Sequence, residues 1–337
     1  MQSAFQIFSS IISILSNSIL LLLICYKSPK KLGSYKYLMM FFTIHSMFFS
    51  LMEVTTRVHV LSYGTCFLVF MNRQGSIFPY EIDMMFLCII CGCCGVTMYI
   101  SAIHFIFRYW AIERKGRLRY FKGYRLIFWL MIPILIGFIW GISVYLGLSV
   151  DETTVAYMRS SMKMGYGYEM EDLVLVGAFY YSPNKIVFYR NLAGMLVVAL
   201  IMTSSAIIII YCGVRIFRKI RKLHKKGSAR VTKRLQTQLY KALVVQTILP
   251  VSLVFFPLAL FFFLPLLHID IGMYSQIANF TVAIYPTLEP LPLLIIIDDY
   301  RNGFCRFLHI ETIIVKKPRV RLSQIQPEIP TISGTTN

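Results

Sequence analysis

Seven apolar runs, each long enough to cross a lipid bilayer, constrain the fold of this chain more than any other feature of its sequence. They span about residues 4–25, 38–60, 83–107, 126–148, 191–214, 240–266 and 272–297. A helix needs about 20 apolar residues to cross a hydrocarbon layer about 30 Å thick, and every run reaches that length. Backbone groups in lipid must bond to one another, and no run alternates as a barrel strand does. We therefore expect an all-α membrane protein, a bundle of seven transmembrane helices.

The composition agrees with that fold class. Of the 337 residues, 57% are hydrophobic and only 15% are charged, which is unusual for a soluble domain. We expect residues 1–308 to form one seven-helix domain. Residues 309–337 are rich in Pro, Ser and Thr, and we expect them to be a disordered cytoplasmic tail.

The placement of positive charge predicts the orientation in the membrane. Of the 34 Lys and Arg residues, 28 lie in alternate connections, namely 26–37, 108–125, 215–241 and the chain after 297. Connections rich in Lys and Arg face the cytoplasm. The N-terminus is therefore expected outside the cell and the C-terminus inside. This pattern also accounts for the net charge of +19 without a nucleic-acid partner.

The cysteines and histidines do not predict an enzyme, a metal site or a cofactor. Cys88 and Cys91 form a CxxC, but it lies inside the third run and no second pair exists to complete a zinc site. Close helix packing beside Gly92 and Gly95 explains it better. The six histidines show no paired spacing, and the last run has no lysine for a retinal Schiff base. Cys305, just past the last run, is equally compatible with palmitoylation and with a free thiol.

Polar residues and prolines inside the runs are candidate functional positions. Glu53 and Arg57 are four residues apart, so they share a helix face, where they either neutralise each other or contribute to a ligand pocket. Prolines punctuate the sixth and seventh runs, and each removes a backbone hydrogen bond. They indicate either a hinge or a static bend, with Pro250, Pro257 and Pro290 as the hinge candidates.

Segment 215–241 is the longest basic connection. Apolar residues recur in it at helical spacing between cations, so the fifth and sixth helices are expected to continue beyond the membrane. Such basic amphipathic extensions suit either an acidic, apolar partner helix or anionic lipid, and the two contacts are compatible.

Four stretches of the chain resemble the nematode serpentine chemoreceptors of the Str superfamily, which are seven-helix G-protein-coupled receptors. They are SPKKLGSYKYLMM (28–40), AIHFIFRYWAI (102–112), TKRLQTQLYKALVVQTILP (232–250) and LPLLIIIDDYR (291–301). The resemblance implies a multi-pass receptor of the plasma membrane, often of sensory cilia. It implies an olfactory-type function, in which an environmental small molecule binds in the bundle and a heterotrimeric G protein is activated.

The resemblance also implies roles for individual residues. Arg108 and Tyr109 stand where other receptors carry an acid-Arg-Tyr triplet, but Phe107 replaces the acid. By depth in the membrane, Asp298 or Asp299 could pair with Arg108 instead. The expected residues for G-protein coupling are Arg108, Tyr109, Arg234, Gln238, Lys241, Tyr300 and Arg301. The expected residues for ligand binding are Glu53, Cys91, Met98, Asn191, Tyr274 and Asn279.

A ligand-gated channel or transporter is the alternative from another class. A transporter should show internal repeats and several buried charges near the membrane midplane, and neither is evident in this sequence. A membrane hydrolase ranks third, because no convergent metal ligands are present.

Overall fold

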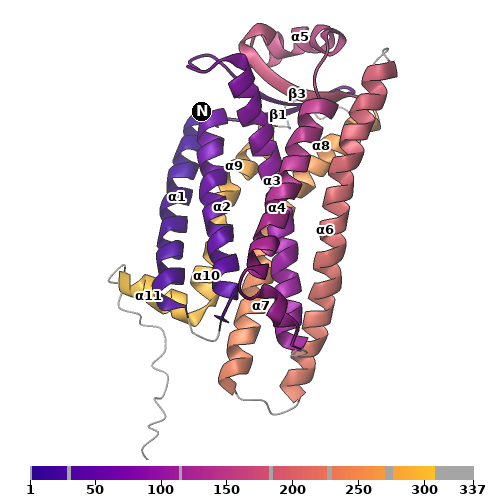
Figure 1. The fold of residues 1–337 in the computed structure, drawn as a ribbon. Helices are drawn as coiled ribbons and strands as arrows, with labels where there is room; N and C mark the ends of the chain where they lie inside the picture. The colour runs from indigo at the N-terminus through magenta and orange to yellow at the C-terminus, as the bar shows by residue number, and fades with distance from the viewer. Residues whose placement is uncertain are drawn as a thin grey trace, which may run out of the picture.

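The computed structural model describes residues 2–28, 32–113, 116–181, 185–225, 230–269 and 276–307. Within these residues, seven helices are long and apolar enough to cross a membrane, so the seven-helix prediction is confirmed (Figure 1). Five are continuous: α1 (Gln2–Lys27), α2 (Tyr35–Thr56), α3 (Tyr80–Glu113), α4 (Arg125–Gly147) and α6 (Lys185–Lys225). The sixth span comprises α7 (Arg230–Pro250), a π-helical turn η4 (Val251–Phe255) and α8 (Phe256–Leu266). The seventh comprises α9 (Gln276–Leu288) and α10 (Leu291–Ile296). The expected tail 309–337 lies outside the described residues.

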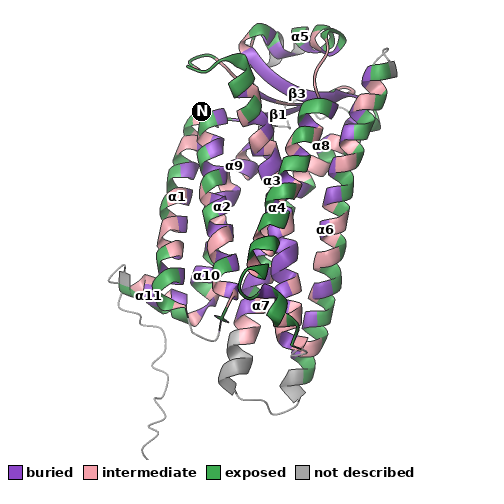
Figure 2. Cartoon of the chain, viewed as in Figure 1, coloured by how far each residue is buried: buried purple, intermediate pink, exposed green. Residues whose placement is uncertain are grey.

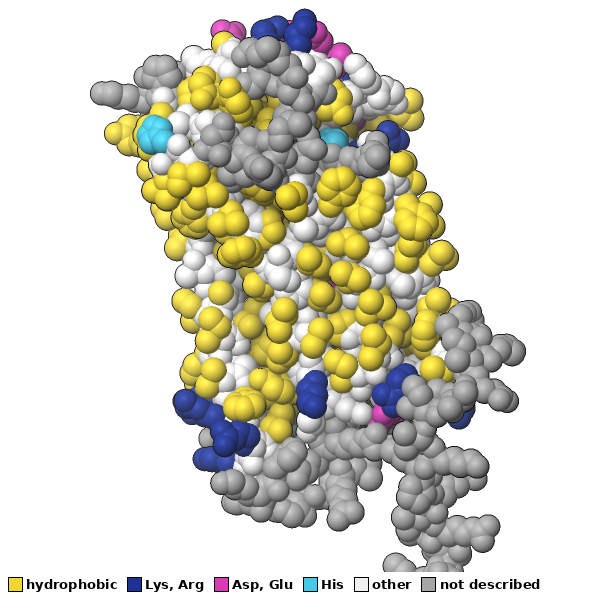
Figure 3. Space-filling view, turned by 180° about the vertical axis from the view of Figure 1, so that it is seen from behind, with side chains coloured by type: hydrophobic (Ala, Val, Ile, Leu, Met, Phe, Trp, Pro, Cys, Tyr) yellow, Lys and Arg dark blue, Asp and Glu magenta, His cyan; other side chains and the backbone are white. Residues whose placement is uncertain are grey.

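The two ends of the bundle differ in structure (Figure 1). One end, here called the sheet end, carries three strands and α5 (Glu152–Tyr166). The other, here called the α11 end, carries α11 (Asp298–Phe307) and the short 3₁₀ helix η2 (Arg117–Phe121). Apolar side chains cover the bundle between the ends, and Lys and Arg side chains lie along the rim of the α11 end (Figure 3). This distribution fits a membrane-spanning bundle.

Helix α3 lies at the centre of the bundle, and a larger share of its residues is buried than in any other of the seven spans (Figure 2). Glycines allow α4 to approach it closely. A Cβ placed on Gly92 would lie only 2.6 Å from the carbonyl oxygen of Gly137. A further glycine pair joins α4 to α6, because a Cβ on Gly147 would lie 2.6 Å from the Cα of Gly194. Small residues therefore determine how the helices pack, as is common in membranes where apolar burial alone does not drive association.

A three-stranded antiparallel sheet, which the seven-helix prediction does not include, closes the sheet end. Its order is β1 (His59–Tyr63), β2 (Cys66–Asn72) and β3 (Leu173–Phe179). Tyr63 pairs with Cys66, so β1 and β2 are joined by a two-residue turn in which Gly64 adopts a positive φ of 56°. β3 comes from the long connection between α4 and α6.

Both faces of the sheet are apolar and buried. Val60, Phe67 and Val176 point toward the bundle and belong to its main core. Leu61, Leu68 and the other alternate residues pack under α5 in a separate core that includes Met158 and Met162. Side chains alternate between the faces of a strand, so a sheet between two apolar layers is apolar at most positions on both faces.

The second span ends earlier than its apolar run. The run was expected to extend to residue 60, but α2 ends at Thr56, and Arg57 adopts a left-handed backbone conformation with φ 44°. His59 and Val60 instead begin the first strand. The apolar run 38–60 is continuous in the sequence because the end of α2 and the start of β1 are both apolar.

We predict that Gly137→Leu destabilises the protein by about 3 kcal/mol, the upper end of the range for overpacking, because a side chain there would meet Val96 and the carbonyl oxygen of Gly92. Thermal unfolding in detergent measures this. The control is Phe138→Leu on the neighbouring position, whose side chain is 65% exposed. Equal melting temperatures for both variants and the parent would contradict the close α3–α4 contact.

Candidate functional site

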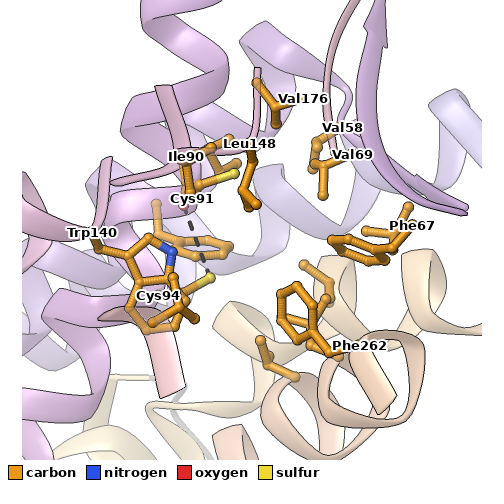
Figure 4. Close-up of a pocket in the computed structure, with 17 residues that line it drawn as sticks. Val58, Phe67, Val69, Ile90, Cys91, Cys94, Trp140, Leu148, Val176 and Phe262 are labelled. Carbon is orange, nitrogen blue, oxygen red and sulfur yellow. Dashed lines mark hydrogen bonds between the residues drawn. The ribbon is translucent and has the colours of Figure 1, made fainter. Parts of the chain in front are cut away.

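A cavity of about 70 Å³ lies in the bundle directly beneath the sheet (Figure 4). Every span except α1 contributes to its wall, and the sheet forms its cover. The lining residues are Phe49, Val58, Val60, Phe67, Val69, Ile90, Cys91, Cys94, Trp140, Val144, Leu148, Val176, Val198, Val254, Leu258, Phe262 and Val282.

The wall of the cavity contains no charged side chain. Its only polar side-chain atoms are the thiols of Cys91 and Cys94 and the indole nitrogen of Trp140, and the Cys94 thiol lies 3.9 Å from the carbonyl oxygen of Ile90. An apolar cavity of this kind stays dry, and an engineered one of about 150 Å³ binds benzene. The geometry therefore suits a small, uncharged, largely apolar molecule.

Hydrogen bonds to helices on several sides hold the sheet in place above the cavity. Asn279 on α9 accepts from the backbone nitrogen of Val60 at 2.7 Å. The backbone nitrogen of Gly177 donates to the carbonyl oxygen of Leu148 at 2.7 Å. Asn191 on α6, with its amide oriented to satisfy both neighbours, accepts from the backbone nitrogen of Phe179 at 3.1 Å. Two residues expected to bind ligand, Asn191 and Asn279, therefore bind the cover of the cavity.

The sheet carries little charge of its own. The ring of His59 stacks on Phe70 with centroids 5.3 Å apart, and burial lowers the pKa of His59 to about 4. Burial likewise raises the pKa of the Cys66 thiol. Both groups are therefore neutral at pH 7, so the cover adds no charge near the cavity.

Glu53 has a different partner from the one considered in the sequence. Its Oε1 accepts from Nε2 of Gln6 at 3.0 Å, and the same nitrogen donates to the carbonyl oxygen of Val58, a wall residue. Arg57 is exposed and makes no ion pair with Glu53, because the helix ends between them and the shared face is lost. The prediction that Glu53 and Arg57 neutralise each other is therefore wrong.

The other predicted ligand residues take three positions. Cys91 lines the cavity. Met98 is buried below it, with its sulfur 3.7 Å from the hydroxyl of Ser205. Tyr274 lies outside the described residues. Sequence reasoning missed the aromatic wall of Phe67, Trp140 and Phe262.

The sixth span connects this cavity to the α11 end. Val254 in η4 and Leu258 and Phe262 in α8 line the cavity. Pro250 ends α7 immediately before the π-helical turn. A helix interrupted in this way is a common feature of functional sites. Two further hinge candidates also mark helix starts: Pro257 lies in the first turn of α8, and Pro290 caps α10.

One turn before Pro250, the sixth span bonds to the seventh. Nε2 of Gln246 donates to Oε1 of Glu289 at 3.0 Å, and both residues are at least 98% buried. The hydroxyl of Ser46 on α2 also interacts with the Glu289 carboxyl. Loss of a donor to a buried carboxyl is costly, so the bond from Gln246 matters to both helices. The Gln246–Glu289 bond is therefore the polar contact that holds α7 against the break between α9 and α10.

Arg108 lies in α3 toward the α11 end of the bundle and is 2% exposed. Its guanidinium carbon sits 3.5 Å from the centre of the Tyr35 ring, a close cation–π contact. Its Nη1 also donates to Oε1 of Gln236 on α7 at 3.5 Å, while Nε and Nη2 have no hydrogen-bond partner. Among the described residues it makes no ion pair with a carboxylate. The ring of Tyr35 therefore contacts Arg108 where other receptors have an acidic neighbour, whose position Phe107 occupies in this chain.

The expected pairing of Arg108 with Asp298 or Asp299 is wrong. Asp298 instead bonds to Nη2 of Arg301 at 2.6 Å within α11, and Asp299 is exposed. The chain turns at Ile297, between α10 and α11, so these two acids do not lie beside α3. A prediction based on depth in the membrane alone could not include this turn.

Glu113, which sequence reasoning did not select, joins three elements at the α11 end. Its carboxylate pairs with Arg117 at 3.2 Å and with Lys219 of α6 at 3.3 Å. The hydroxyl of Tyr109 also donates to it at 3.3 Å. Tyr109 is therefore tied to the contact between α3 and α6 rather than to Arg108.

The remaining predicted coupling residues differ in accessibility. Tyr300 is fully buried, and its hydroxyl lies 2.8 Å from that of Ser28. Gln238 is half-buried and Lys241 is exposed, both on α7. Arg301 binds Asp298 as described above. The side chain of Arg234 lies outside the described part of the chain. Within that part, no group of three His, Cys, Asp or Glu residues is placed to hold a metal ion.

Comparison with known proteins identifies the relatives of this chain. Residues 2–305 match the family described as "Serpentine type 7TM GPCR chemoreceptor Str". The chain is 28% identical to serpentine receptor class r-10 of Caenorhabditis elegans over 83% of each protein. It is also 28% identical to G-protein coupled receptor str-217 of the same organism, over 88% of this chain and 87% of that receptor.

The family match covers nearly all of the described residues, including all seven spans and α11 up to Cys305. The resemblance that the four sequence stretches indicated is therefore confirmed. The chain belongs to the Str family of serpentine seven-transmembrane chemoreceptors, a family of G-protein-coupled receptors.

Proposed function

We propose that this receptor detects a small, uncharged, largely apolar molecule in the cavity beneath the sheet and activates a heterotrimeric G protein at the α11 end. The observation that carries the proposal is the apolar cavity of about 70 Å³, whose wall includes the sixth span. In this arrangement the sheet end faces the outside and the α11 end faces the cytoplasm. The rim of Lys and Arg at the α11 end supports that orientation (Figure 3).

The ligand class follows from the wall of the cavity. A charged or strongly polar molecule would lose its hydration without gaining partners, because the wall has only two thiols and one indole nitrogen to offer. An apolar molecule gains contacts with side chains on every face. The matching family is described as one of chemoreceptors. That description fits detection of a volatile compound at the plasma membrane, including the membrane of a sensory cilium.

The signal passes along the sixth span. A ligand in the cavity presses on Val254 within the π-helical turn and on Leu258 just after it. The turn lacks the regular backbone bonds of an α-helix, so displacement there is less costly than within α7. The rigid α7 then moves as a unit, and its contacts at Gln246 and Gln236 are strained or released. This is a shift between two populations of the bundle, driven by the ligand's preference for one of them.

Release of α7 exposes Arg108 to the G protein. In the structure, Gln236 lies against the guanidinium, and Tyr35 covers its face. When α7 moves away, two unsatisfied N–H groups of Arg108 become available to carbonyl oxygens at the end of a partner helix. Exposed Lys241 and the basic ends of α6 and α7 attract an acidic partner surface.

We predict that filling the cavity removes ligand binding without unfolding the receptor. Trp140 reports occupancy in a Trp110→Phe, Trp129→Phe background, because these are the chain's only other tryptophans. Chloroform, a small apolar quencher, should quench Trp140 in lipid nanodiscs, and Val144→Phe should reduce that quenching about fivefold. Leu146→Phe, on the lipid-facing side of the same helix, is the control. Equal quenching in the Val144 variant and the parent would show that the cavity does not accept such molecules.

We predict that Gln246→Leu raises ligand-independent activity. Loss of one buried hydrogen bond of about 1 kcal/mol should shift the resting equilibrium about fivefold toward the released state. Basal nucleotide exchange on co-reconstituted Gα measures the shift. Ser252→Ala, an exposed position on the same span that bonds only within its own helix, should leave the exchange rate unchanged. If the folded Gln246 variant exchanges no faster than the parent, the Gln246–Glu289 bond does not hold the resting state.

A further inference from the structure

The sheet covers the cavity and is firmly bonded to its surroundings. Hydrogen bonds join the sheet to Asn279 of α9, to Asn191 of α6 and to Leu148, which caps α4. The sheet is also buried under α5, with β3 buried along its whole length. A ligand entering from water would have to separate strands or lift two apolar layers. The route to the cavity must therefore be sought elsewhere on its wall.

A cleft of about 320 Å³ lies between α6 and α8 on the side of the bundle that faces lipid. Its wall is almost entirely apolar and includes Met195, Ala199, Ala259 and Phe263. Phe263 is 60% exposed, so the cleft opens toward the bilayer rather than into the core. At its sheet end, the hydroxyl of Tyr181 donates to the carbonyl oxygen of Leu266 at 2.8 Å, which ties the chain after β3 to the end of α8.

The cleft and the cavity share two wall residues. Val198 of α6 and Phe262 of α8 each line both spaces. These two side chains are therefore the partition between the cavity and the lipid-facing cleft. Phe262 is half-buried and rests on the ring of Phe67, with centroids 4.5 Å apart (Figure 4). Rotation of the Phe262 side chain alone would join the two spaces without breaking a backbone hydrogen bond.

Another groove, of about 510 Å³, touches the cavity wall from the side of α3 and α4, but it is a poorer route. It shares only Val176 with the cavity, and its own wall includes Glu81. Val176 is 1% exposed and lies in β3, where it pairs with Val69 and bridges to Ser149. Opening there requires a strand to move, whereas opening at Phe262 requires one side chain to rotate.

We propose that the ligand enters sideways from the bilayer, through the cleft between α6 and α8, with Phe262 as the gate. This proposal rests on the proposed function of the cavity and adds the route and a property of the ligand. The molecule must dissolve in the membrane before it binds, so the receptor responds to its concentration in lipid. An apolar molecule that follows this path never leaves an apolar environment after it enters the bilayer.

The test measures how fast chloroform reaches Trp140, again in the Trp110→Phe, Trp129→Phe background in lipid nanodiscs. Mixing with chloroform-loaded vesicles starts the quenching, which stopped-flow fluorescence follows. The double variant Ala199→Phe, Ala259→Phe fills the cleft without altering a cavity residue. It should slow quenching about tenfold and leave the final amplitude unchanged, because a blocked passage slows entry and exit alike. Phe262→Ala should speed quenching.

Leu200→Phe is the matched control, since this residue neighbours Ala199, is 60% exposed and does not line the cleft. Its quenching rate should equal that of the parent. Equal rates in the parent, the cleft-filling variant and Phe262→Ala would overturn the lateral route. That result is distinguishable from failure of the cavity itself, which appears as quenching that Val144→Phe does not reduce.

Discussion

The rest of the site depends on one constraint: the sheet β1–β3 is held between two apolar layers and bonded to the helices at its edges. Its lower face completes the wall of the cavity, and its upper face packs under α5. Because Asn279, Asn191 and Leu148 satisfy backbone groups of the sheet, polar groups at this end of the bundle are used internally. What remains in the cavity is apolar surface. The same bonds that make the cover stable therefore underlie both the proposed ligand class and the proposed route of entry.

A second consequence concerns the sixth span. It lines the cavity, bonds to Glu289 and contacts Arg108. Its π-helical turn contains Val254, one of the cavity residues, and lies on the cavity side of the other two contacts. The sixth span thus connects the cavity to the surroundings of Arg108 through one continuous backbone with one irregular segment. Neither Arg108 nor Glu289 has a charged partner in the described residues, and each is bonded by an amide of α7.

The sequence predicted the spans because runs of about 20 apolar residues have few alternative structures. It did not predict the sheet, because a strand buried on both faces lacks the polar alternation that distinguishes a strand from the end of an apolar helix. The strand β1 was therefore included in the second span. At the site, Cys91 was placed on the correct helix, but the wall formed by Phe67, Trp140 and Phe262 comes from three distant segments. Arg108 was recognisable as a buried cation without a neighbouring acid, whereas its cover by Tyr35 depends on how α2 packs against α3.

The most direct test of the central claim, that occupancy of the cavity moves the inner end of α7, is a distance measurement between spin labels. Genetically encoded labels at Lys122, after η2, and Lys241, on α7, are both exposed and lie outside the buried contacts described above. The probe is any small apolar compound that quenches Trp140 in the parent but not in the Val144→Phe variant. Pulsed electron resonance should show a longer distance between the labels when Trp140 is fully quenched. The same distance distribution with the cavity empty and filled would contradict the claim.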